Sequence, residues 1–175
     1  MTKVGIVGIG DMGSGIAKNL MANGFEVHGL DLDADRMQAF TKAGGVAATN
    51  LAELGRDASA VFVMVMTGAQ AEAVIFGEEG LAANMADGAS IILTATIKPA
   101  EAEVIGRKLA DTAIHLIDSP VSGGFPGAQS GTLTMMAAGP EAALTASRPI
   151  MEAVSSTIHI VGDAAPKGQM IKACL

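Results

Sequence analysis

The sequence predicts an α/β fold built on a doubly wound, mostly parallel sheet. Short apolar runs alternate along the chain with segments of helical periodicity, and the run at residues 60–66, AVFVMVM, is apolar throughout. Continuous apolar runs are typical of parallel strands that helices cover on both faces. The first apolar run leads through Gly8, Gly10 and Gly13 into a helical segment. Strand, glycine turn and helix in this order predict the start of such a sheet.

The glycine turn at residues 8–13 has the GxGxxG spacing of dinucleotide-binding sites in Rossmann-like domains. In that interpretation Gly8 makes the tight turn, Gly10 lets the backbone approach a pyrophosphate, and Gly13 lets the helix close on the strand. The amino end of the helix offers unpaired N–H groups to the phosphates. Glycines that serve only the packing of the turn are the alternative. We expect cofactor contacts at Gly8, Ile9, Gly10, Asp11, Met12 and Gly13.

Asp31 stands at the end of the second expected strand, residues 25–30. An acidic side chain at this place accepts hydrogen bonds from the hydroxyls of the adenosine ribose. It would repel a 2′-phosphate, and the next residue is Leu32 rather than an arginine. These features favour NAD over NADP. Two alternatives stay open, since Asp31 could be an ordinary turn residue and Arg36 is close enough to accept NADP.

The remaining strands and helices are predicted from the spacing of apolar residues, the length of each apolar segment and the capping residues beside it. Strands are expected at residues 4–7, 25–30, 46–48, 60–66, 89–93, 114–117, 133–138 and 157–161. A first helix should end at Gly24, and further helices are expected at residues 34–42, 51–54, 69–76, 81–85, 100–110, 141–154 and 164–175. Asp33 and Asn50 are the expected N-caps of two of them. Pro99 suits a first helical turn, whereas Pro149 would kink or end its helix.

In a parallel sheet, ligands lie across the carboxyl ends of the strands. The segments that follow the expected strands should therefore meet at one edge. They are residues 8–13, Asp31, Met66 with Thr67, residues 94–96 and residues 118–124. We expect Met66 and Thr67 to contact the cofactor.

A second glycine-rich stretch, DSPVSGG at residues 118–124, comes directly after a strand. The N–H groups of Gly123 and Gly124 and the hydroxyl of Ser122 could together hold a carboxylate. A tight connection that needs glycine at positive φ is an equally good interpretation. Near the end of the chain, Lys172 stands one turn into a helix, where a lysine is usually a solvated surface residue, and Lys167 is its neighbour.

Composition and charge exclude several classes of protein. With 175 residues, half of them apolar, one domain with a large core is expected. No apolar run reaches the roughly 20 residues that cross a bilayer, and no signal peptide is recognised. A net charge of −7 without a basic block argues against nucleic acid. The single cysteine, Cys174, argues against a disulfide or a zinc site, so we expect no metal and a reduced, cytoplasmic setting.

Three stretches of the chain resemble the β-hydroxyacid dehydrogenase family. They are VGIVGIGDMGSGIAKNLMANG, then DSPVSGG with GAQSGTLTMMAAG, and GQMIK, in the family's order and spacing. The family includes 3-hydroxyisobutyrate and 6-phosphogluconate dehydrogenases. The stretches HGLDLDADRM and VIFGEEG look closest to its L-threonate dehydrogenase branch.

The resemblance implies an NAD- or NADP-dependent oxidoreductase of hydroxy acids, which is a homo-oligomer at full length. Lys172 falls on the family's catalytic lysine and would take the hydroxyl proton as hydride leaves for the nicotinamide. Ser122, Gly123 and Gly124 would hold the substrate carboxylate, and Thr96 would lie beside the nicotinamide. Two positions depart from the family pattern. Ala95 replaces a serine, and Leu175 stands where an asparagine is common.

The family joins a Rossmann-like domain to an all-helical C-terminal domain, which is absent from this chain. We therefore expect a dinucleotide-binding domain at residues 1–163, and at residues 164–175 the start of an interdomain helix. Met170, Ile171 and Leu175 would then lack packing partners. The alternative to a dehydrogenase is a stand-alone dinucleotide-binding or redox-sensing module without catalysis.

Overall fold

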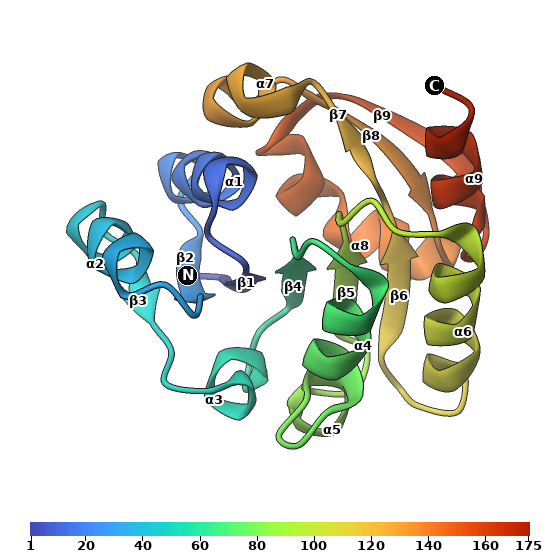
Figure 1. The fold of residues 1–175 in the computed structure, drawn as a ribbon, viewed down its shortest axis with the longest axis horizontal. Helices are drawn as coiled ribbons and strands as arrows, with labels where there is room; N and C mark the ends of the chain where they lie inside the picture. The colour runs from blue at the N-terminus through green and yellow to red at the C-terminus, as the bar shows by residue number, and fades with distance from the viewer.

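The computed structural model describes residues 1–175 and contains a nine-stranded sheet with helices on both faces (Figure 1). The strands are β1 (Lys3–Val7), β2 (Glu26–Leu30), β3 (Val46–Ala47), β4 (Ala60–Val63), β5 (Ser90–Leu93), β6 (His115–Asp118), β7 (Val121–Ser122), β8 (Leu133–Ala138) and β9 (Ser155–Gly162). Their order is β3-β2-β1-β4-β5-β6-β8-β7, and β9 pairs with β8. Strands β1 to β6 run parallel, whereas β8 is antiparallel to β6 and β7. The predicted doubly wound, mostly parallel sheet is confirmed.

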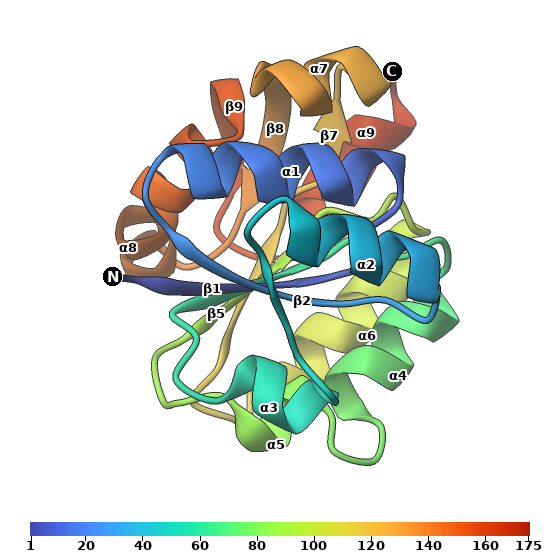
Figure 2. The same cartoon turned by 90° about the vertical axis from the view of Figure 1, so that its left-hand side faces the viewer.

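Helices cover each face of the sheet and enclose two apolar cores. They are α1 (Asp11–Ala22), α2 (Ala34–Lys42), α3 (Leu51–Gly55), α4 (Gly68–Phe76), α5 (Leu81–Asn84), α6 (Pro99–Leu109), α7 (Gly124–Ser130), α8 (Glu141–Glu152) and α9 (Lys167–Ala173). One core of 23 buried residues lies under α1, α2, α7 and α8, and the other, of 20, lies under α3 to α6. Figure 2 shows α1 and α3 on opposite sides of β1 and β2.

The strands alternate between the two cores with the period of two that a pleated strand requires. In β4, Ala60 and Phe62 enter one core, and Val61 and Val63 enter the other. All of them are 0% exposed, which explains why the sequence of β4 is continuously apolar. None of the helices combines the length and hydrophobicity that a bilayer crossing requires.

The predicted caps fix where several helices begin. The Asp33 carboxylate accepts from the N–H groups of Asp35 and Arg36, and the Asn50 side chain accepts from the Glu53 N–H. Thr67 forms a capping box with Gln70 at the start of α4. These bonds satisfy N–H groups that a helix cannot pair internally.

Some boundaries differ from the prediction. The strand expected at residues 60–66 ends at Val63, because the chain then turns against Gly8 and into the cap of α4. The last helix begins at Lys167 rather than at 164, since Pro166 disfavours helical geometry in the residue before it. Strand β7 and helix α7 were not predicted. Pro149 lies inside α8, which ends at Glu152.

Candidate functional site

The carboxyl ends of five neighbouring parallel strands form one edge of the sheet. Val7 of β1 pairs with Leu30 of β2 and Val63 of β4. Leu93 of β5 pairs in turn with Val63 and with Asp118 of β6. This row of strand ends brings together the segments that the sequence predicts for the site. They are the glycine turn, Asp31, Met66 with Thr67, Thr96 and the stretch from Asp118 to Gly124.

The glycine turn needs two of its glycines for its own packing. Gly8 has a φ of +89°, and a Cβ there would lie 2.1 Å from the Met64 carbonyl oxygen. A Cβ on Gly13 would lie 1.9 Å from the Gly8 carbonyl oxygen. Gly10 is different, because the nearest atom to a Cβ there would be an Arg36 side-chain nitrogen at 3.7 Å. The protein's own packing therefore leaves Gly10 with room on its open side, where a ligand can approach the backbone.

Asp31 holds the glycine turn to the end of β2. Its Oδ2 accepts from the Ile9 N–H at 2.6 Å, and its Oδ1 accepts from the Asp33 N–H at 2.9 Å. The Arg36 guanidinium lies 3.6 Å from Oδ2. The Asp31 side chain is only 9% exposed, whereas that of Arg36 is 53% exposed. Asp31 thus has a structural role in addition to the one predicted for it.

Helix α1 begins at this turn without a side-chain cap, so the N–H groups of its first residues are available to a ligand. A depression of about 260 Å³ lies beside it, and Gly10, Asp11 and Arg36 are among the residues that line it. Open N–H groups at the amino end of a 12-residue helix suit a phosphate group. The residues present therefore fit the dinucleotide that the sequence predicts.

Met66, Thr67 and Thr96 lie at the same edge in different environments. The Thr67 hydroxyl accepts from the Gln70 N–H, so it already serves as a helix cap. The Met66 side chain is exposed, with 85% of the residue's surface accessible. Thr96 is exposed between the buried residues Ala95 and Ile97. Met66 and Thr96 are free to contact a ligand, whereas the Thr67 side chain is engaged within the protein.

The stretch after Asp118 combines an extended segment with two glycines at positive φ. Ser122 ends β7 and is partly buried. Gly123 has a φ of +123° and Gly124 a φ of +56°, which are conformations that favour glycine. The tight connection that the sequence offered as an alternative is therefore present. It leaves the two glycines exposed, so their backbone is also accessible to a ligand.

Helix α7, which follows these glycines, packs directly on α1. A Cβ on Gly15 would lie 2.5 Å from the Ala128 carbonyl carbon, so only glycine permits this approach. The Asn19 amide donates to the carbonyl oxygens of Ala128 and Gln129. This contact joins α7, which follows the stretch at Ser122–Gly124, to the helix that follows the glycine turn, although more than 100 residues separate Asn19 from its partners.

Lys167 and Lys172 differ in what surrounds them. The Lys167 ammonium pairs with the exposed Asp163 carboxylate at 2.5 Å. Lys172 is partly buried on α9, and its side chain forms no hydrogen bond or ion pair within the chain. Of the two lysines, Lys172 therefore has the nitrogen that is free for chemistry.

Two buried polar residues, Asp118 and Gln169, join α9 to the sheet edge, and neither was predicted as a site residue. The Asp118 carboxylate accepts from the Gln169 N–H and from its side-chain amide, each at 3.1 Å. Burial raises the pKa of the Asp118 carboxyl above its ordinary value, and the hydrogen bonds from Gln169 and Gly168 partly oppose this. The sequence signal that could have found them is that Asp118 begins the DSPVSGG stretch and Gln169 lies in GQMIK, two of the stretches that carry the family resemblance.

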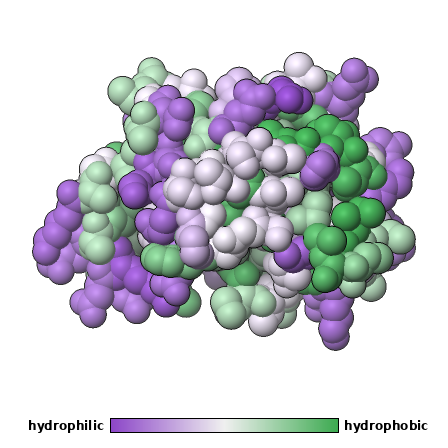
Figure 3. Space-filling model, turned by 90° about the horizontal axis from the view of Figure 1, so that it is seen from above, coloured by the Kyte–Doolittle hydropathy of each residue, from purple (hydrophilic) through white to green (hydrophobic).

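Exposed apolar residues of α9 lie close to this edge. Met170, Ile171 and Leu175 are 53%, 42% and 83% exposed, as the sequence predicted. In Figure 3, hydrophobic residues gather on the right-hand side, where Figure 1 places α9. The residues of the site and this apolar surface thus adjoin.

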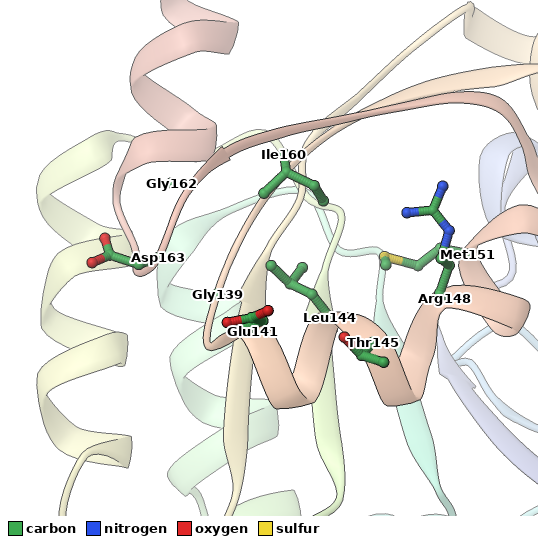
Figure 4. Close-up of a pocket in the computed structure, with 9 residues that line it drawn as sticks. All are labelled: Gly139, Glu141, Leu144, Thr145, Arg148, Met151, Ile160, Gly162 and Asp163. Atoms are coloured by element: carbon green, nitrogen blue, oxygen red, sulfur yellow. The ribbon is translucent and has the colours of Figure 1, made fainter.

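A separate pocket of about 400 Å³ lies between α8 and β9 (Figure 4). Its lining contains none of the predicted site residues. Of its three charged residues, Arg148 and Asp163 already pair with Glu152 and Lys167, and the third is Glu141 at the start of α8. Nothing in this pocket points to a ligand.

Comparison with known proteins extends these observations. The family model described as the NAD binding domain of 6-phosphogluconate dehydrogenase matches residues 3–162. An L-threonate dehydrogenase of Cupriavidus necator is 40% identical over 169 residues, which are 97% of this chain and 57% of the relative. An NAD-dependent L-serine dehydrogenase of Pseudomonas aeruginosa is 33% identical and covers 99% of this chain, which corresponds to 58% of the relative.

Solved structures agree with the fold. The crystal structure of a 3-hydroxyisobutyrate dehydrogenase from Salmonella typhimurium superposes with a TM-score of 0.94 at 32% identity, over 99% of this chain and 61% of that one. A Mycobacterium tuberculosis 3-hydroxyisobutyrate dehydrogenase with L-serine gives a TM-score of 0.91 at 29% identity, over 99% and 58%. The chain therefore spans less than two thirds of the length of these relatives.

Proposed function

Because the chain belongs to the family of the NAD-binding domain of 6-phosphogluconate dehydrogenase, we propose that it is the cofactor-binding part of an NAD-dependent dehydrogenase of small hydroxy acids. The family membership confirms the resemblance and the cofactor class predicted from the sequence. One observation carries the rest of the proposal. The glycine turn, Asp31 and Thr96 follow the carboxyl ends of β1, β2 and β5 at one edge of the sheet. At the same edge, Asp118 ends β6, precedes Ser122 by four residues and holds the start of α9, the helix of Lys172.

The cofactor contacts that we propose are those of the glycine turn and its neighbours. The pyrophosphate would lie against Gly10 and the amino end of α1, where there is room and N–H groups have no side-chain cap. Asp31 would accept hydrogen bonds from the adenosine ribose. A carboxylate that is 9% exposed leaves little room for a 2′-phosphate, so we propose NAD as the preferred cofactor. Arg36, 3.6 Å from Asp31, is the residue that would support NADP instead.

The nicotinamide, when bound, accepts a hydride from the substrate carbon. For the substrate, we propose that the hydroxyl of Ser122 and the exposed backbone of Gly123 and Gly124 hold a carboxylate. The Lys172 Nζ takes the proton of the substrate hydroxyl as the hydride leaves, so the alcohol becomes a carbonyl. Thr96 would lie beside the nicotinamide. L-threonate is the first hydroxy acid to test, since several relatives are named L-threonate dehydrogenase.

We further propose residues 1–163 as the dinucleotide-binding domain and residues 164–175 as the beginning of an interdomain helix. The apolar residues exposed on α9 support this boundary, because exposed apolar patches are typical of contact surfaces. A homo-oligomer at full length remains part of the proposal.

Two measurements test the proposal. Calorimetric titration of NAD and NADP into the folded chain should give saturable binding that is tighter for NAD. The full-length gene product should then form NADH with at least one member of a panel of hydroxy acids. If neither dinucleotide binds, the assignment is contradicted. If NADP binds more tightly than NAD, the role given to Asp31 is contradicted.

The second candidate is a dinucleotide-binding or redox-sensing module without catalysis. It requires only the glycine turn, the uncapped amino end of α1 and Asp31, and it gives Lys172 no role. NAD binding without turnover of any hydroxy acid by the full-length gene product would support it.

A further inference from the structure

The Gln169 side chain links three segments of the site. Its amide nitrogen donates to the Ala95 carbonyl at 2.9 Å and to Asp118 Oδ1 at 3.1 Å. Its amide oxygen accepts from the Ile97 N–H at 3.1 Å. Gln169 is 1% exposed, so all these bonds form away from water. The residue between its two loop partners is Thr96, which is exposed.

Asp118 supplies the cap that α9 lacks locally. Pro166 precedes the helix and offers no side-chain hydrogen bond. The Asp118 carboxylate, which is 0% exposed, accepts from the Gln169 N–H in the first turn instead. The contact is also close for the backbone, because a Cβ on Gly168 would lie 2.4 Å from the Asp118 carbonyl oxygen. The start of α9 is therefore fixed to the end of β6 by both backbone packing and a buried carboxylate.

Lys172 follows Gln169 by three residues on the same helix, and residues at that spacing lie on one side of a helix. We propose that Asp118 and Gln169 are positioning residues, which hold α9 against the loop after β5 and so fix Lys172 relative to Thr96. The inference rests on the role of Lys172 in the proposed function. The pair acts through the helix and touches neither substrate nor cofactor.

Three variants and one matched control test the pair. Gln169→Met keeps the side-chain length but removes the side-chain hydrogen bonds to Ala95, Ile97 and Asp118. Asp118→Asn places a donor opposite the donors of Gln169. The double variant Asp118→Asn with Gln169→Glu keeps the charge of the pair and can remake three of its four hydrogen bonds. Asp163→Asn is the control, because it removes an exposed carboxylate that lies four residues before the same helix and pairs with its first residue.

The first readout is amide hydrogen exchange in α9, measured on the folded chain. Exchange should become at least tenfold faster in each single variant, should stay unchanged in Asp163→Asn, and should slow again in the double variant. Unchanged exchange in both single variants would overturn the inference. So would a double variant that exchanges as fast as the single ones. If Asp118→Asn does not fold, Gln169→Met, which changes no charge, still shows whether the side-chain hydrogen bonds of Gln169 fix α9.

The second readout is turnover by the full-length gene product. Each single variant should lower kcat at least tenfold and leave the KM for NAD within twofold, and the double variant should recover most of kcat. If the single variants keep their kcat while Lys172→Ala is inactive, this inference is overturned and the proposed function stands. If Lys172→Ala is fully active, the proposed role of Lys172 is contradicted, and hydrogen exchange still shows whether the pair fixes α9.

Discussion

The Ile9 backbone N–H donates to the Asp31 carboxylate over 2.6 Å, so the acidic residue at the end of β2 holds the glycine turn at the end of β1. The same carboxylate also accepts from the Asp33 N–H. Asp31 therefore shapes the turn that is proposed to bind the phosphates and lies beside the proposed ribose site. A substitution there should therefore change both stability and cofactor choice.

Replacing Asp31 by alanine should have two separable effects. The N–H groups of Ile9 and Asp33 lose their acceptor, which should cost about 1–3 kcal/mol of unfolding free energy. NAD affinity should fall at least tenfold and the preference should shift toward NADP, because Arg36 then keeps only Asp33, at 3.9 Å, as an acidic partner. Urea unfolding and calorimetry with both dinucleotides measure these effects. An unchanged ratio of NAD to NADP affinity would refute the specificity role of Asp31.

The glycines of the turn should respond differently to alanine. Gly13→Ala should destabilise the fold by about 3 kcal/mol or more, because its Cβ would lie 1.9 Å from a backbone oxygen. Gly10→Ala should change stability by less than about 1 kcal/mol, since its φ of −75° is ordinary and nothing is close. NAD affinity should nevertheless fall at least tenfold in Gly10→Ala. Unaltered affinity in that folded variant would place the cofactor elsewhere.

Removing the proposed acid–base group should affect turnover far more than folding. Lys172→Ala should lower kcat of the full-length gene product by about 10²–10⁴-fold, which is typical of general acid–base groups. Lys167→Ala is the matched control on the same helix, and it loses only an exposed ion pair. Initial rates of NADH formation measure both variants. If the two variants lost activity equally, Lys172 would have no special role.

The buried Asp118 carboxyl should give stability a distinctive pH dependence. Burial raises its pKa in the folded state, so between its ordinary and its raised pKa the folded state binds more protons than the unfolded state. Stability from this group is thus complete below the ordinary pKa and is lost as pH rises through the raised one, by at most about 1.4 kcal/mol per pH unit. Side-chain hydrogen bonds lower the pKa values of Glu26, Glu53 and Asp163. These three carboxyls therefore stabilise the fold at higher pH, and that stability is lost as the pH falls.

Comparison with Asp118→Asn isolates that effect, because the three lowered carboxyls are common to both proteins. Urea unfolding over a pH series should show the wild type losing stability relative to the variant as pH rises above the ordinary carboxyl range. A difference that is constant with pH would show that Asp118 has the same pKa in both states.

Local sequence signals were enough to predict most of the fold. The apolar run of β4, the caps Asp33 and Asn50 and the turn at Gly8 each follow from nearby residues, and the structure contains them. The meeting of the predicted site segments at one edge of the sheet could also be predicted, because the loops that follow parallel strands all lie at the carboxyl edge. The ends of β4 and α9 were misjudged, since tertiary contact at Gly8 and the geometry before Pro166 set them.

The features that were missed depend on contacts between distant residues. Asp118 and Gln169 are 51 residues apart, and although each lies in a stretch that carries the family resemblance, nothing local to either stretch indicates that the two side chains pair. Helix α7 contains glycines and a proline that disfavour helices, and its packing on Gly15 and Asn19 of α1 stabilises it. The catalytic role of Lys172 rests on the family resemblance alone, and it stays a prediction.

The central claim is that a nicotinamide dinucleotide binds at the carboxyl edge of the sheet, and NMR titration of the labelled chain with NAD tests it most directly. We predict saturable shifts of the backbone amides of Gly8 to Gly13, Asp31, Thr67 and Thr96, with little change in the pocket between α8 and β9. Shifts confined to that pocket, or no shifts at all in the folded chain, would contradict the account.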